Sequence, residues 1–183
     1  MSSPETGTIK VWDPVVRLSH WLLVASVALA WFTTEGYGRW HERIGYLALA
    51  VAVVRIFWGF TGSHYARFSQ FVRSIRHTFA YARSVIASRQ PRYLGHNPLA
   101  GWMGLALLLM VLLVTGTGVL YTTDTFWGVE WVEELHEVLA YLMLPLIAFH
   151  IIGAIATSRH HKENLVAAML HGNKRPAERD DID

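Results

Sequence analysis

The chain has no cysteine among its 183 residues. This absence excludes disulfide bonds, thiolate-bound zinc and iron–sulfur clusters, and it excludes haem attached covalently through a C-x-x-C-H motif. A metal bound to this chain must therefore have nitrogen or oxygen ligands. Histidine, with ten copies, supplies nitrogen donors.

Charged residues are also scarce, at 16% of the chain, whereas 52% of the residues are hydrophobic and eight are tryptophan. These values and the positive mean hydropathy are typical of a protein whose main solvent is membrane lipid. The formal net charge is only +2. We therefore expect no nucleic-acid partner.

Four apolar segments each approach the ~20 residues that a helix needs to cross the bilayer core. They cover residues 14–33, 41–60, 98–121 and 132–157. Asp13-Pro14 and Asn97-Pro98 each place a capping side chain before a proline in the first helical position, which marks two of the helix starts. The sequence predicts an all-α fold, an integral membrane four-helix bundle.

Acidic residues are absent from residues 61–97, which contain six arginines. The positive-inside rule places such a segment in the cytoplasm, and both termini then lie there as well. Residues 68–86 mix aromatic and basic side chains and predict an amphipathic helix in the headgroup region. A solvated basic loop bound to anionic lipid is the alternative. The opposite, outer surface carries Asp124, Glu130, Glu133, Glu134 and Glu137.

The two ends of the chain differ from the spans. We expect one transmembrane domain over residues 1–175, followed by a disordered polar tail over residues 176–183. Ala28-Leu29-Ala30 resembles a signal-peptide cleavage site. The histidine and tryptophans of the first span are unlike a signal-peptide core, so we expect that span to be retained.

Four histidines lie in or at the ends of the spans: His20, His41, His136 and His150. Fourteen positions separate the last two, which brings them within ~40° of one helix face and sets them ~21 Å apart along the axis. His136 and His150 therefore mark two levels in the membrane. Following the chain places His20 at the cytoplasmic level of His150, and His41 at the outer level of His136.

Two imidazoles that face each other across a bundle are the axial ligand set of a six-coordinate b-type haem. A mononuclear zinc or copper site needs three or four protein ligands at one point, whereas each level offers two. Interhelical hydrogen bonding and a histidine proton relay stay open as alternatives.

The sequence resembles the prokaryotic membrane cytochrome b561 family, which includes cytochrome b subunits of nickel–iron hydrogenases, over residues 10–175. The motifs that carry the resemblance are VWDPVVRLSHW, HERIGYLALAVAVVRIFWGF, GSHYARF, GHNPLAGWM, LHEVLAYLMLPLIAFHIIG and ENLVAAMLHGNKR. The resemblance implies a multi-pass protein of the bacterial inner membrane with two b haems. The implied axial ligands are His20 with His150 for the inner haem and His41 with His136 for the outer haem.

The resemblance also implies quinone exchange, with ubiquinone or menaquinone, at one haem and a periplasmic redox partner at the other. Arg17, Arg55 and Arg67 are candidate contacts for haem propionates or quinone. Snorkelling to the interface and binding of anionic lipid are the alternatives for these arginines. Gly116 and Gly118 allow the third span either to approach a porphyrin or to pack closely on another helix.

We therefore expect transmembrane electron transfer between membrane quinone and a periplasmic partner such as a c-type cytochrome. The chain shows no nucleophile or general-base constellation, and we expect an electron carrier or a subunit of a quinone-linked oxidoreductase. The alternatives are the membrane-anchor cytochrome b subunit of a hydrogenase-like complex and a superoxide:quinone oxidoreductase. From another class comes a histidine-based proton or metal transporter.

Overall fold

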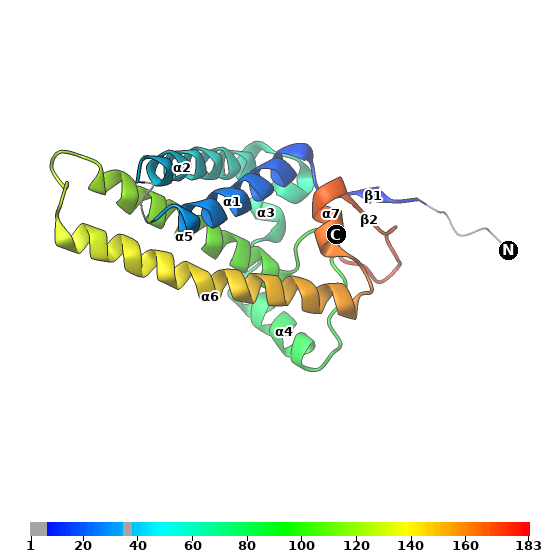
Figure 1. The fold of residues 1–183 in the computed structure, drawn as a ribbon. Coiled ribbons are helices and arrows are strands. Elements are labelled where there is room, and N and C mark those ends of the chain that lie inside the picture. The colour runs from blue at the N-terminus through cyan, green and yellow to red at the C-terminus, as the bar shows by residue number, and fades with distance from the viewer. Residues whose placement is uncertain (1–6, 35–37) are drawn as a thin grey trace. The chain divides into compact units, whose positions relative to one another are not determined.

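The computed structural model describes residues 7–34 and 38–183. Within this part of the chain, four helices are long and apolar enough to cross a membrane. They are α1 (Pro14–Phe32), α2 (Gly38–Thr61), α5 (Pro98–Tyr121) and α6 (Glu130–His160), shown in Figure 1. The prediction of an all-α membrane fold with four spans is confirmed.

Six short elements complete the described chain: β1 (Ile9–Lys10), η1 (His64–Ala66), α3 (Phe68–Phe71), α4 (Ile75–Ile86), α7 (Leu165–His171) and β2 (Asn173–Lys174). The antiparallel pair β1–β2 joins the chain near its two ends, with Ile9 opposite Lys174. These two strands lie beside α7 in Figure 1.

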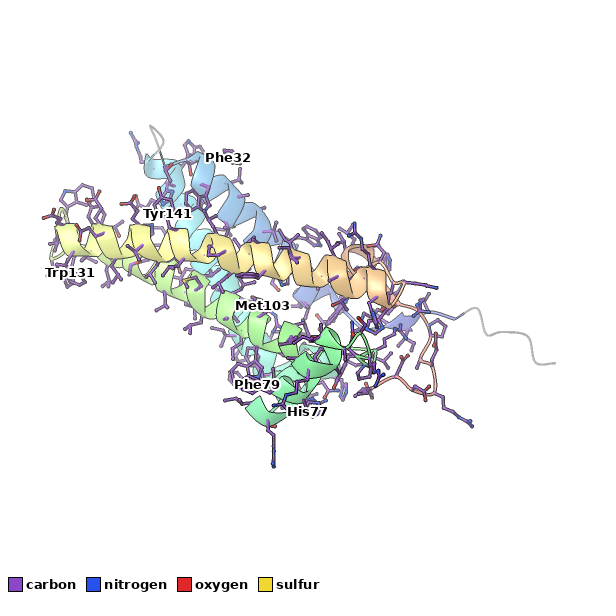
Figure 2. All side chains as sticks on the ribbon, turned by 90° about the horizontal axis from the view of Figure 1, so that it is seen from below. Phe32, His77, Phe79, Met103, Trp131 and Tyr141 are labelled. Atoms are coloured by element: carbon purple, nitrogen blue, oxygen red, sulfur yellow. The ribbon has the colours of Figure 1, made fainter. Side chains whose placement is uncertain are left out.

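The segment predicted as one amphipathic helix over residues 68–86 forms two helices, α3 and α4. The Ser74 side chain accepts a hydrogen bond from the backbone N–H of His77 and so starts a new helix at that point. On α4, Phe79 is exposed and Tyr81 is buried; Phe79 is labelled in Figure 2. This one-sided pattern suits a helix in the headgroup region, and contact with lipid stays a prediction.

The chain divides into two compact units. The terminal unit contains the residues up to 17, residues 58–103 and residues 150–183. The central unit contains residues 18–57 and 104–149. Each of the four long helices contributes one part to each unit, and all six short elements belong to the terminal unit.

The predicted start signals of α1 and α5 are both formed. Asp13 Oδ1 accepts from the N–H of Val16 at 3.0 Å, and Asn97 Oδ1 accepts from the N–H of Ala100 at 2.9 Å. Asp13 Oδ2 also accepts hydrogen bonds from Trp58 Nε1 and Ser63 Oγ. Burial raises the pKa of Asp13, but these hydrogen bonds outweigh it and hold the pKa below its ordinary value. Asp13 therefore joins the start of α1 to the end of α2.

A buried ionic network, formed by Arg92, Glu163, Lys174 and Asp181, lies in the terminal unit. Arg92 Nη2 donates to Glu163 Oε1 at 2.7 Å, and its Nη1 donates to Asp181. Lys174 Nζ lies 3.6 Å from Glu163 Oε2. None of the four side chains is more than 6% exposed.

The last residues of the chain differ from the expected disordered tail. The N–H of Ile182 donates to the carbonyl of Arg92, and the N–H of Leu94 donates to the carbonyl of Ile182, each at 2.9 Å. Composition alone predicts disorder for residues 176–183. The buried guanidinium of Arg92, however, needs carboxylate partners, and Asp181 is one of them. The division at residue 175 stays a prediction.

Candidate metal centre

His41 and His136 come together inside the central unit. His41 lies near the start of α2 and His136 lies in the second turn of α6. Their ring centroids are 6.1 Å apart and the ring planes make an angle of 77°. Both side chains are half-buried. The structure thus brings together the two histidines that the sequence places at one level.

A backbone carbonyl of α1 fixes the imidazole of His41. Its Nδ1 lies 3.0 Å from the carbonyl oxygen of Ala30. A carbonyl oxygen can only accept, so Nδ1 carries the proton and Nε2 keeps its lone pair. In this tautomer Nε2 is the nitrogen that can bind a metal.

The imidazole of His136 is fixed in the same way from α5. Its Nδ1 lies 2.9 Å from the carbonyl oxygen of Val114 and 3.1 Å from Thr117 Oγ1. The carbonyl again requires the proton on Nδ1 and leaves the lone pair on Nε2. Metal-binding histidines ordinarily donate their second N–H to such a partner, which sets ring orientation and raises ligand basicity.

The geometry of this pair fits a haem iron. With a metal–imidazole bond of ~2 Å on each side, the centres of two axial imidazoles are about 6 Å apart, close to the observed 6.1 Å. Among residues 7–34 and 38–183, no group of three or more metal-binding side chains occurs. Two histidines with a tetrapyrrole that supplies four equatorial nitrogens complete a six-coordinate iron.

The second predicted pair divides between the two units. His20, on α1, belongs to the central unit, and His150, on α6, belongs to the terminal unit. Both are half-buried, and the His20 ring contacts Trp21 edge-on with centroids 5.1 Å apart. The pairing of His20 with His150 stays a prediction.

The three candidate arginines lie in or near helix ends. Arg17 Nη1 donates to the carbonyl of Leu170 in α7 at 2.7 Å. Arg67 Nε donates to the carbonyl of Gly62, just beyond α2, at 2.9 Å. Arg55 is half-buried within α2. Arg17 and Arg67 therefore satisfy helix-end carbonyls, and contacts of the three arginines with propionates or quinone stay predictions.

The contacts made by α5 were not predicted from the sequence. A Cβ placed on Gly118 would lie 3.2 Å from His136 Cε1, so the close neighbour of this glycine is the imidazole. A Cβ on Gly116 would meet nothing within 4 Å. The G-T-G sequence at residues 116–118 is a local signal for this place, but its threonine is not distinctive, because hydroxyls in membrane helices commonly bond their own backbone.

Comparison with known proteins identifies the family. The sequence profile of the prokaryotic cytochrome b561 family matches residues 11–172. This chain belongs to that family. As a cytochrome b561 it is a membrane cytochrome b with a role in electron transfer, and the family implies haem b. The histidine pair in the central unit fits that group.

Two curated relatives are each described as a probable Ni/Fe-hydrogenase B-type cytochrome subunit. The protein from Bradyrhizobium diazoefficiens is 22% identical, with 91% of this chain and 86% of the relative covered. The protein from Rhizobium leguminosarum bv. viciae is 21% identical, with 97% of this chain and 93% of the relative covered. No solved structure matches the chain.

Proposed function

We propose that this cytochrome b561 transfers electrons across the bacterial inner membrane between quinone and a redox partner at the outer surface. It holds two b haems, the outer one by His41 and His136 and the inner one by His20 and His150. The observation that carries the proposal is the outer pair, with ring centroids 6.1 Å apart and each Nδ1 bonded to a backbone carbonyl. Both termini and residues 61–97 face the cytoplasm.

The residues of the chain bind and orient the cofactor. Bound haem supplies reversible one-electron redox chemistry at its iron. Ala30 and Val114 hold the protons of the two ligand imidazoles on Nδ1. Apolar helices around the site exclude water and thereby set the redox potential. Arg17, Arg55 and Arg67 contact the inner-haem propionates or the quinone, which is ubiquinone or menaquinone.

The outer surface suits a basic redox partner such as a c-type cytochrome. The acidic residues between α5 and α6 and in the first two turns of α6 are exposed: Asp124, Glu130, Glu133, Glu134 and Glu137. Trp131 lies near the start of α6 (Figure 2) and is 55% exposed. A cluster of acidic side chains attracts a basic partner over long range and raises its association rate.

A second candidate is the membrane anchor of a hydrogenase-like complex. Two relatives with that subunit description align over 86% and 93% of their own lengths, which favours a similar subunit role. The partner is then an oxidoreductase subunit that stays bound. Purification from the native membrane in mild detergent separates the two candidates, because an anchor co-purifies with its enzyme and a shuttle does not.

Reduction of the purified protein by quinol tests the proposal. Reduced-minus-oxidised spectra should show low-spin b-haem bands after addition of ubiquinol or menaquinol, and subsequent addition of a basic c-type cytochrome should reoxidise them. A haem-free transporter gives no such bands. Haem bands that neither quinol reduces would contradict quinone exchange while leaving the haem assignment intact.

A further inference from the structure

Helix α5 supplies none of the proposed haem ligands, yet the Val114 carbonyl and the Thr117 hydroxyl hydrogen-bond His136, and Gly118 leaves space next to the ring. We propose that Thr117 and Gly118 are positioning residues for the outer haem. They set the rotation and hydrogen bonding of the His136 ring and thereby the retention and potential of that haem. This inference rests on the proposed role of His136 as an axial ligand.

Thr117 has a fixed hydroxyl. Its Oγ1 lies 2.9 Å from the carbonyl oxygens of Leu113 and Val114, and the residue is buried. The hydroxyl hydrogen must point to one of these carbonyls, because a carbonyl cannot donate. An oxygen lone pair therefore faces the Nδ1–H of His136, 3.1 Å away. Nδ1–H is shared between the Val114 carbonyl and the Thr117 hydroxyl.

This shared hydrogen bond acts on the metal through the ring. An acceptor at Nδ1–H makes the imidazole more basic at Nε2 and favours the ferric over the ferrous iron. Replacement of Thr117 by valine keeps the shape of the side chain and removes the acceptor. The outer haem should then be held less tightly and have a higher midpoint potential.

Gly118 affects the rotation of the His136 ring because it leaves space beside the imidazole. A methyl group there would lie 3.2 Å from Cε1 of His136, which is closer than an ordinary contact, and 3.4 Å from Nδ1. The ring or the helix must shift to admit it. At Gly116 the same methyl group would meet nothing within 4 Å.

The chain provides a matched control for each residue. Thr115 is a second buried threonine of α5, and its Oγ1 donates to the Val111 carbonyl at 2.7 Å. Thr115→Val therefore removes a hydroxyl from α5 outside the contact with His136. Gly104→Ala adds a methyl group elsewhere on the same helix, where it would meet nothing within 4 Å.

The experiment compares Thr117→Val, Thr117→Ser and Gly118→Ala with Thr115→Val and Gly104→Ala in the purified protein. The readouts are haem transfer to excess apomyoglobin, the midpoint potential, and the ferric low-spin EPR signal, which responds to axial ring orientation. Thr117→Val should lose the outer haem about tenfold faster, as expected for loss of a partner that orients a metal ligand, and Thr117→Ser should restore the wild-type rate. Gly118→Ala should shift the EPR signal. Both controls should stay within about twofold of wild type in the same comparison.

His136→Ala separates failure of this inference from failure of the proposed function. If His136→Ala removes no haem, the proposed ligand assignment fails, and the positioning role fails with it. If His136→Ala removes one haem while Thr117→Val and Gly118→Ala behave like their controls, the positioning role is overturned and the ligand assignment stands. Should Thr117→Val fail to fold, Gly118→Ala decides the question, because an EPR signal equal to that of its control would overturn the positioning role.

Discussion

Among the described residues of the central unit, the buried polar residues all have hydroxyl side chains, whereas among those of the terminal unit they are all ions. The central set is Ser19, Ser26, Thr115 and Thr117, and the terminal set is Arg92, Glu163 and Lys174. Ions are costly within hydrocarbon, while a hydroxyl can bond the carbonyl one turn before it. The half-buried His41 and His136 follow the pattern of the central unit, because each imidazole bonds a backbone carbonyl there.

Breaking the ionic network should produce the largest difference in stability between the two units. Arg92→Met leaves Glu163 and Asp181 buried without their shared partner, which should destabilise the terminal unit by about 3–5 kcal/mol. Limited proteolysis should then cut the C-terminal segment rapidly, while the outer-haem spectrum persists. Arg83→Met, at an exposed position of α4, is the control. If Arg92→Met lost the outer haem and Arg83→Met kept it, haem binding in the central unit would depend on the stability of the terminal unit.

A smaller loss of stability is expected from substitutions at the start of α1, in the terminal unit. Asp13→Ala removes an N-cap and two further hydrogen bonds, from Trp58 and Ser63, and should lower stability by about 2 kcal/mol. Asn97→Ala removes the cap of α5 and should cost about 1 kcal/mol. Thermal unfolding of the two variants measures the difference. Equal losses would mean that the Trp58 and Ser63 contacts contribute little.

Acid should loosen the terminal unit. Burial raises the pKa of Glu163, but hydrogen bonds from Arg92 and the Arg175 N–H, with the Lys174 charge, bring it below the ordinary value of 4.5. The folded state thus binds this proton more weakly than the unfolded state. Its stabilising contribution is complete above pH 4.5 and is lost as the pH falls through the lowered pKa.

Hydrogen exchange of residues 174–183 between pH 7 and pH 3 tests this. Protection should fall in the acid range in wild type, whereas Glu163→Gln should be less protected already at pH 7 and should change less with pH. The same pH profile in wild type and Glu163→Gln would exclude Glu163 as the titrating group.

The smallest effect concerns the outer surface. Replacing Glu133, Glu134 and Glu137 by glutamine should slow electron delivery to a basic cytochrome a few-fold at low salt and leave it unchanged at high salt, where charges are screened. Stopped-flow rates at two ionic strengths measure this. If the variant and the wild type had the same rate at low salt, the acidic residues would have no role in partner binding.

The sequence predicts the fold closely because hydrophobic length and capping residues are local signals. Residues 98–121 are α5 as predicted, and Asp13 and Asn97 cap as predicted. The first span ends one residue earlier than predicted, the second is longer, and α6 extends from Glu130 to His160, beyond the predicted 132–157. Polar residues at the ends of α6 continue its helical hydrogen bonding, which hydropathy does not detect.

The sequence predicts less of the histidine site than of the fold. The spacing of His136 and His150 follows from helix geometry, and the depth of His41 follows from the direction of the chain. The contacts of His136 with Val114 and Thr117 depend on how α5 and α6 are rotated about their axes, which no single-helix pattern determines. The pairing of Arg92 with Glu163 joins residues 71 positions apart and leaves no local signal.

The central claim is that His41 and His136 are the axial ligands of one haem. The most direct measurement is haem content per polypeptide, with reduced-minus-oxidised spectra, for wild type, His41→Ala, His136→Ala and the α4 control His77→Ala. Wild type and His77→Ala should contain two b haems, and each of the other variants should keep one, with the same remaining spectrum. Folded His41→Ala and His136→Ala proteins that retain both haems, or that lose different ones, would contradict the claim.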